Sequence, residues 1–175
     1  MKKRFFILLL LVLSSKLLIA QNVTSPQEQA SIKQVISDEA KYYVAKDYDK
    51  WILLYRQTPQ VYFATTEKGK MIQKDGWDAL NSFVTSFFAE GKKNETATYK
   101  RENVNFRKVN PTYVWLTFDQ VKTFEGKKEA TKELRIVELI KGEWKIVNRT
   151  GFLSTNPKLE ESKKGEDKPE KKQPK

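Results

Sequence analysis

The chain has 175 residues and a formal net charge of +11, and it contains neither histidine nor cysteine. No disulfide can therefore form, and the side chain that most often titrates near neutral pH is missing from any site. Aromatic residues make up 12% of the chain and supply the apolar area that a core without crosslinks requires.

Residues 1–20 have the layout of a secretory signal peptide. A basic start at 2–4 precedes an apolar run over 5–13, and Ala20 precedes the expected cleavage point. The apolar run is too short to span a membrane, and no cysteine is available to carry a lipid. We therefore expect a secreted or periplasmic protein that begins near Gln21 and has no membrane partner once the signal is removed.

The basic charge is smaller in the expected mature chain. The signal segment carries four lysines or arginines and no acid, so its removal lowers the net charge from +11 to +7. Many of the remaining charges alternate in sign, as in Lys100-Arg101-Glu102. A nucleic-acid site needs a basic stripe with interleaved aromatic residues. The sequence therefore predicts no nucleic-acid partner.

Two helices are predicted first. Ser25-Pro-Gln-Glu28 combines an N-cap serine, a proline at the first helical position and a glutamate that completes a capping box, and the helix runs to about Lys46. Its apolar residues recur at helical spacing: Ile32, Val35, Ile36, Ala40, Tyr43 and Val44. A shorter helix capped by Asp49 follows, and Pro59 ends it.

A short hairpin, a third helix and four long strands complete the domain. The hairpin strands are expected at 60–66 and 71–73, and Asp75-Gly-Trp-Asp78 opens a helix that ends at Gly91. The long strands are expected at 96–109, 112–124, 130–140 and 143–153, with turns at Asn110-Pro111, Glu125-Gly126 and Lys141-Gly142.

The domain is expected to occupy residues 21–156. The last segment, 157–175, has one large apolar residue, Leu159, among lysines, acids and prolines. Such a segment cannot bury enough surface to offset the loss of chain entropy, so it is predicted to be a disordered charged tail.

Four segments carry a resemblance to a known superfamily: Asp47-Tyr-Asp-Lys-Trp51, Gly76-Trp-Asp-Ala-Leu80, Lys132-Glu-Leu-Arg-Ile-Val137 and Gly142-Glu-Trp-Lys-Ile-Val147. Together with the order of elements, they resemble the nuclear transport factor 2-like superfamily, especially its SnoaL-like and calcium/calmodulin kinase association-domain branches. The resemblance covers roughly 27–154. It implies an α+β fold in which three helices pack on a curved antiparallel sheet, forming a cone with a pocket at its wide end.

The resemblance leaves the activity open. The superfamily includes isomerases, dehydratases, epoxide hydrolases and members that only bind or dimerise. Several catalytic branches use a pocket histidine, often on the last strand, where this chain has Asn148-Arg-Thr150. A base would have to be a carboxylate whose pKa is raised by burial. The chain has no Walker loop, dinucleotide fingerprint, nucleophile elbow or metal-ligand spacing, so no cofactor and no metal are predicted.

The last hairpin supplies two candidate ligand-binding residues. A two-residue turn at Lys141-Gly142 would place Arg135 opposite Asn148, at the end of an apolar face that also contains Trp144, Ile146, Leu139 and Val137. Apolar depth that ends in two polar groups is typical of a pocket wall. The alternative is a core strand whose polar end reaches solvent.

The preceding strand supplies three more. Trp115, Thr117 and Asp119 share one face, and an apolar set shares the other: Val114, Leu116 and Phe118. The register across 125–128 is ambiguous by one residue, which would exchange the faces. We expect the first face to line the pocket because only it offers hydrogen-bonding groups. Asp119 is then the candidate base; the alternative is a structural ion pair.

Two tyrosines are further candidates for the pocket, and two tryptophans are expected elsewhere. Tyr55 and Tyr62 are candidates to close its mouth or to donate to an oxyanion, although tyrosines more often pack with the hydroxyl at the surface. Trp51 and Trp77 lie on apolar helix faces and are expected in the core.

We therefore expect an exported protein that binds a small apolar or amphipathic molecule. One alternative is a lyase or isomerase with Asp119 as base and Arg135 or a tyrosine stabilising an enolate-like oxygen. Another is a homodimerising module whose interface is the outer sheet face. An apolar outer face would favour the dimer, and a buried Asp119 with a raised pKa would favour the enzyme.

Overall fold

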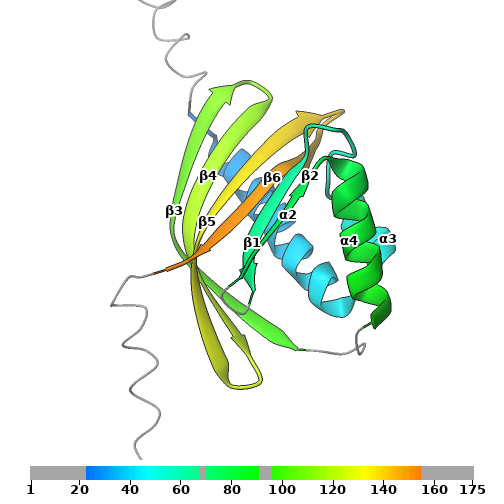
Figure 1. The fold of residues 1–175 in the computed structure, drawn as a ribbon. Coiled ribbons are helices and arrows are strands. Elements are labelled where there is room, and N and C mark those ends of the chain that lie inside the picture. Colours follow the sequence, from blue (N-terminus) through cyan, green and yellow to red (C-terminus); the bar gives the residue numbers. More distant parts are fainter. Residues whose placement is uncertain (1–22, 68–69, 91–95, 155–175) are drawn as a thin grey trace, which may run out of the picture.

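The computed structural model describes residues 23–67, 70–90 and 96–154. In this part three helices, α2 (Pro26–Ala45), α3 (Tyr48–Ile52) and α4 (Trp77–Glu90), lie on one side of a single sheet (Figure 1). None of the helices described is both long enough and apolar enough to cross a membrane. The expected signal segment, 1–20, and the expected tail, 157–175, lie outside the described residues.

The described sheet has six strands in the order β2-β1-β6-β5-β4-β3. They are β1 (Tyr62–Glu67), β2 (Lys70–Asp75), β3 (Ala97–Asn110), β4 (Tyr113–Phe124), β5 (Lys127–Ile140) and β6 (Glu143–Leu153). Neighbouring strands are antiparallel except β1 and β6, which run parallel, so the sheet is mixed rather than wholly antiparallel. The long strands curve around α2 (Figure 1), which confirms the expected α+β class.

Local signals place the helix starts. Ser25 and Glu28 form the predicted capping box: the Glu28 amide donates to Ser25 Oγ at 3.1 Å, and the Ser25 amide donates to Glu28 Oε2 at 2.8 Å. The second helix begins two residues earlier than expected, because Asp47 rather than Asp49 accepts from the Lys50 amide. Asp49 lies inside the first turn of α3.

The turn between β4 and β5 removes the ambiguity in their register. It consists of Glu125 and Gly126, both with positive φ (49° and 74°), and Phe124 pairs directly with Lys127. This conformation suits the twist of a two-residue hairpin.

The core decides which face of β4 points toward the helices. The inward set is at most 2% exposed and packs in the apolar core: Val114, Leu116 and Phe118. Trp115, on the opposite face, is 46% exposed. The prediction that Trp115, Thr117 and Asp119 face the helices is therefore wrong. Burial of the more apolar set outweighs the hydrogen-bonding groups that motivated the prediction.

A β-bulge at Val147 changes the face of every residue that follows it in β6. Between the turn and the bulge the register is the predicted one, but beyond the bulge Asn148 pairs with Ile136, and Arg149 pairs with Arg135. Because side chains alternate along a strand, one extra residue turns Asn148 outward and Arg149 inward. The predicted pair of Arg135 with Asn148 is therefore wrong.

The two faces of β4 can be distinguished by stability measurements. Phe118→Ala should lower the free energy of unfolding by about 3–5 kcal/mol, because a buried ring is lost, whereas Trp115→Ala should cost less than about 1 kcal/mol, because its side chain is already half in water. Denaturant titration of both variants measures the difference. Equal losses, or a larger loss for Trp115→Ala, would contradict the assignment of faces.

Candidate functional site

Charged side chains meet inside the apolar core, between α2 and strands β5 and β6. Glu39 from α2 and Glu133 and Arg135 from β5 are each at most 3% exposed. Arg135 Nη1 donates to Glu133 Oε2 at 2.6 Å, and Arg135 Nη2 lies 3.8 Å from Glu39 Oε2. Arg149 Nη1, from β6, donates to Glu39 Oε1 at 2.7 Å. We call Glu39, Glu133, Arg135 and Arg149 the buried charge network.

The network shifts the pKa of one of its members, Glu133, and of its neighbour Tyr55. Burial by itself would raise the pKa of Glu133, but the positive charges of Arg135 and Arg149 and the Thr131 hydroxyl, which donates at 2.6 Å, keep that pKa below its ordinary value. Burial, and then the charge of Glu39, raises the pKa of Tyr55 well above its ordinary value. At neutral pH, Glu133 is therefore an acceptor and Tyr55 a donor, and neither is poised to transfer a proton.

A glycine makes room for Glu133. Gly151 lies opposite Glu133 in β6, and a Cβ atom at Gly151 would lie 2.8 Å from Glu133 Oε1. Any side chain at this position would displace the carboxylate. The buried charge network therefore depends on a residue that carries no charge.

Sequence reasoning missed three of the four network residues. Glu39 had a signal, since it shares the apolar helix face of Ile32 and Ile36. Glu133 stands two residues before Arg135 on the same strand face, which is a weaker signal. Arg149 faces inward only because of the bulge, and no motif in the sequence predicts that bulge.

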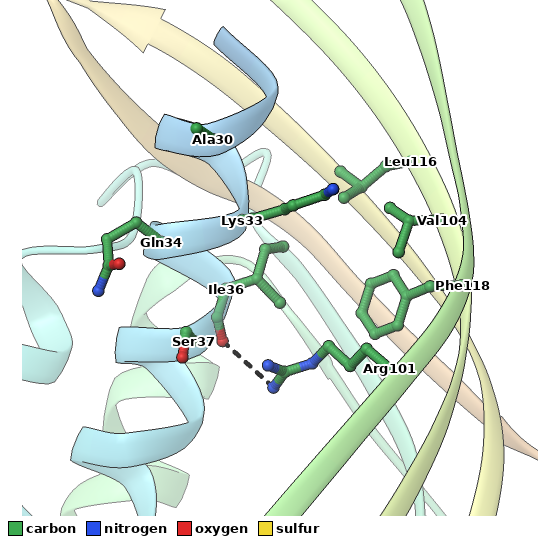
Figure 2. Close-up of a pocket in the computed structure, with 9 residues that line it drawn as sticks. All are labelled: Ala30, Lys33, Gln34, Ile36, Ser37, Arg101, Val104, Leu116 and Phe118. Carbon is green, nitrogen blue, oxygen red and sulfur yellow. Dashed lines mark hydrogen bonds between the residues drawn. The ribbon is translucent and has the colours of Figure 1, made fainter. Parts of the chain in front are cut away.

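A groove of about 380 Å³ opens between α2 and the inner face of β3 and β4 (Figure 2). Its walls are largely apolar: Ala30, Ile36, Val104, Leu116 and Phe118. Its polar lining residues are Lys33, Gln34, Ser37 and Arg101. Figure 2 shows Lys33 reaching from the helix and Arg101 from the sheet into the space between them. No acidic side chain is among these lining residues of the described chain.

Arg101 connects this groove to the buried charge network. Its Nε donates to Gln120 Oε1 at 2.9 Å, and its Nη2 donates to the Ile36 carbonyl at 3.5 Å (dashed line in Figure 2). Gln120 Nε2 donates onward to Glu133 Oε1 at 3.2 Å. Burial lowers the pKa of Arg101.

A second, smaller cavity of about 130 Å³ lies against the same inner face, and both Arg149 and Glu133 line it. The Arg149 guanidinium lies 4.9 Å from the centre of the Phe63 ring and 5.5 Å from that of Tyr43. Most of the other residues that line this second cavity are polar: Thr65, Thr66, Tyr99, Gln120, Lys122, Glu129 and Thr131. An amphipathic ligand therefore fits this cavity less well than it fits the groove.

The seven predicted ligand-binding residues separate onto the two sides of the sheet. Tyr55 and Arg135 lie inside: Tyr55 donates to Glu39 Oε1 at 3.1 Å, and Arg135 is 1% exposed within the buried charge network. Five lie on the outer face: Tyr62, Trp115, Thr117, Asp119 and Asn148. Arg135 is thus a structural ion-pair partner rather than the polar end of a pocket.

Asp119 has the environment of a structural ion pair. It accepts hydrogen bonds from Asn103 Nδ2 at 2.6 Å and from Lys132 Nζ at 2.8 Å. These two contacts, the Asn103 bond first, hold the pKa of Asp119 below its ordinary value. A carboxylate with a lowered pKa is a poor proton acceptor at neutral pH, which is the opposite of what the base role requires.

Replacing Glu133 by glutamine should destabilise the domain at neutral pH and less so in acid. The variant leaves the buried Arg135 without its closest carboxylate, which costs about 3–5 kcal/mol. The pKa of Glu133 is lower in the folded chain, so its contribution is complete above the ordinary value of 4.5 and is lost as the pH falls through the folded value. Denaturant titrations of wild type and variant should therefore converge with acidification.

Glu102→Gln is the control for this experiment. Glu102 forms an exposed ion pair with Lys100, so its loss should change stability little at either pH. A difference between wild type and Glu133→Gln that does not depend on pH would contradict the assigned ionised state of Glu133.

Comparison with known proteins supports the fold alone. Neither a protein-family model nor a curated protein matches the sequence. Among solved structures, an NTF2-like protein of unknown function from Pseudomonas putida is 10% identical with a TM-score of 0.57, over 77% of this chain and 94% of that one. The association domain of C. elegans CaMKII is 15% identical with a TM-score of 0.55, over 71% and 95%.

A third solved structure, Aln2 from a Streptomyces species, is 10% identical with a TM-score of 0.58, over 75% of this chain and 93% of that one. Identities this low carry no information about activity. Each of the three structures is matched over more than 90% of its own length with a TM-score above 0.5. The chain therefore has the fold of the nuclear transport factor 2-like superfamily.

Proposed function

We propose that the protein is an exported binding protein that takes a small amphipathic molecule into the groove between α2 and strands β3 and β4. The observation that carries the proposal is the composition of the groove, whose apolar walls are edged by a few polar groups. Small-molecule sites typically combine these features in a volume of roughly 300–1,000 Å³. The groove, at about 380 Å³, is within that range.

The lyase or isomerase alternative has less support. Its candidate base, Asp119, lies on the outer face beside Lys132, away from the groove. The inward carboxylates Glu39 and Glu133 are both paired with arginines. Binding without chemistry is therefore the function that we propose.

Export rests on the amino-terminal segment, which lies outside the described residues. The intact mass of the secreted protein tests it. A mass that includes residues 1–20 would contradict the proposal that this segment is a signal peptide removed on export.

A large side chain placed in the groove should weaken binding of an apolar probe without disturbing the core. Ala30 lines the groove from an exposed position on α2, so Ala30→Trp places an indole where the ligand would lie. We expect at least a tenfold loss of affinity, about 1.4 kcal/mol, for the neutral fluorescent probe N-phenyl-1-naphthylamine.

Ser31→Trp is the matched control, because Ser31 is exposed on the same helix but is not among the residues that line the groove. It should leave the affinity unchanged. Equal losses in the two variants, or no binding to the wild-type protein, would refute the proposed site.

Homodimer formation through the outer sheet face is a second candidate. Two rows of uncharged residues cross this face from β4 to β1; we call them the outer patch: Trp115, Ile136, Asn148 and Tyr62, and beside them Thr117, Leu134, Thr150 and Ala64. Interface centres are similarly poor in charge and rich in aromatic residues. One structural neighbour is itself described as an association domain.

Trp115→Glu should convert the proposed dimer to a monomer, because a charge would be buried at the centre of the interface. Sedimentation velocity over a range of concentrations measures the mass. Val109→Glu is the control, since Val109 is exposed near the end of β3 and lies outside the outer patch. A wild-type protein that stays monomeric at high concentration would rule the dimer out.

A further inference from the structure

We infer that the groove selects an amphipathic anion, which places its acidic head group between Arg101 and Lys33 and its apolar body along Ile36, Leu116 and Phe118. The inference rests on the proposed function and adds the sign of the ligand's charge. Three observations support it: the pairing of charges inside the domain, the contacts of Arg101, and the position of Lys33.

The buried charge network leaves a neighbouring guanidinium, that of Arg101, without a carboxylate partner among the described residues. In the buried charge network two carboxylates, Glu39 and Glu133, oppose two guanidinium groups. Arg101 is a third guanidinium on the same side of the sheet. Within 23–67, 70–90 and 96–154 it forms no ion pair with any carboxylate.

The partners of Arg101 are neutral. Its Nε donates to the Gln120 amide oxygen, and its Nη2 donates to the Ile36 carbonyl. Its Nη1 donates to no residue of the described chain. An arginine has five N–H donors, so several remain for a ligand. Two of them suit the two oxygens of a carboxylate or the oxygens of a sulfonate.

The surroundings of Arg101 strengthen its attraction for an anion. Its guanidinium lies 5.8 Å from the centre of the Phe118 ring, and Arg135 lies 5.5 Å from the same ring. Two cations thus share one aromatic side chain while only Arg135 has carboxylate partners. A charge that is half removed from water without a counter-ion is costly, and a ligand anion would offset that cost.

Lys33 adds a second positive charge from the opposite wall. Its side chain extends from α2 toward the sheet (Figure 2), and its Nζ lies 5.8 Å from the centre of the Phe106 ring. The acid that α2 does direct at β3, Glu28, is already paired with Lys108 at 2.7 Å. Both cations of the groove therefore remain available for a ligand.

The test compares three probes that are built on an eight-carbon chain and differ in head group: octanoate, octanol and octyltrimethylammonium. Calorimetric titration of the mature chain should show octanoate binding at least tenfold more tightly than octanol, and the cation more weakly than either. Arg101→Gln and Lys33→Gln should each lower the affinity for octanoate by more than the affinity for octanol, so that the two affinities converge.

Arg107→Gln is the matched control, since it removes the same charge from the exposed, opposite face of β3. It should leave the affinity for octanoate unchanged. A loss equal to that of Arg101→Gln would mean that the net charge of the surface, rather than the groove, attracts the anion, and would overturn the inference.

The remaining outcomes separate this inference from the proposed function. Equal binding of octanoate and octanol by the wild-type protein would overturn the anion preference and leave amphipathic binding in place. Binding of none of the three probes would refute the proposed function itself. Lys33 is exposed, so Lys33→Gln provides the test even if Arg101→Gln fails to fold.

Discussion

The pairing of Glu39 with Arg149 and Arg135 is the constraint on which the rest of this structure depends. It joins the first helix to the last two strands inside a core that is otherwise apolar. Ionised groups are costly to bury, so such a network is tolerable only when every member has its partner. The curved sheet must therefore close around α2 at one position, with the bulge at Val147 turning Arg149 inward.

The same constraint divides the inner face into two regions of different chemistry. Within the buried charge network each carboxylate is paired with an arginine. Toward β3, Arg101 has no such carboxylate among the described residues, because its hydrogen bonds reach the network only through the neutral amide of Gln120. The groove lies at this point, so Arg101, which pairs with none of the described carboxylates, stands beside apolar walls formed by Ile36, Leu116 and Phe118.

The structure also separates two surfaces that could serve different purposes. Five of the residues that looked like ligand contacts in the sequence lie together on the outer face, four of them within the outer patch: Tyr62, Trp115, Thr117 and Asn148. Hydrogen-bonding and aromatic side chains on a strand are compatible with a pocket or with a protein interface. Which of the two they form depends on the face that the core selects.

Much of the fold followed from local chemistry in the sequence. The capping box of Ser25 and Glu28 acts within one helical turn, and the Lys141-Gly142 turn sets its hairpin through two residues, so both were predictable without the rest of the chain. The candidate site was not. The inner face of β4 was decided between an apolar set and a set with hydrogen-bonding groups, and only packing in the core resolves that choice.

The position of Arg149 depends on a single extra residue in β6, and the burial of Glu39 depends on arginines about a hundred residues away. Sequence by itself determined the elements and their order, because capping, turn chemistry and hydrophobic periodicity are local, and the resemblance that this order carries indicated the fold. Tertiary structure alone decided which charges meet and which remain unpaired, because charge pairing in a core depends on contacts between residues far apart in the chain.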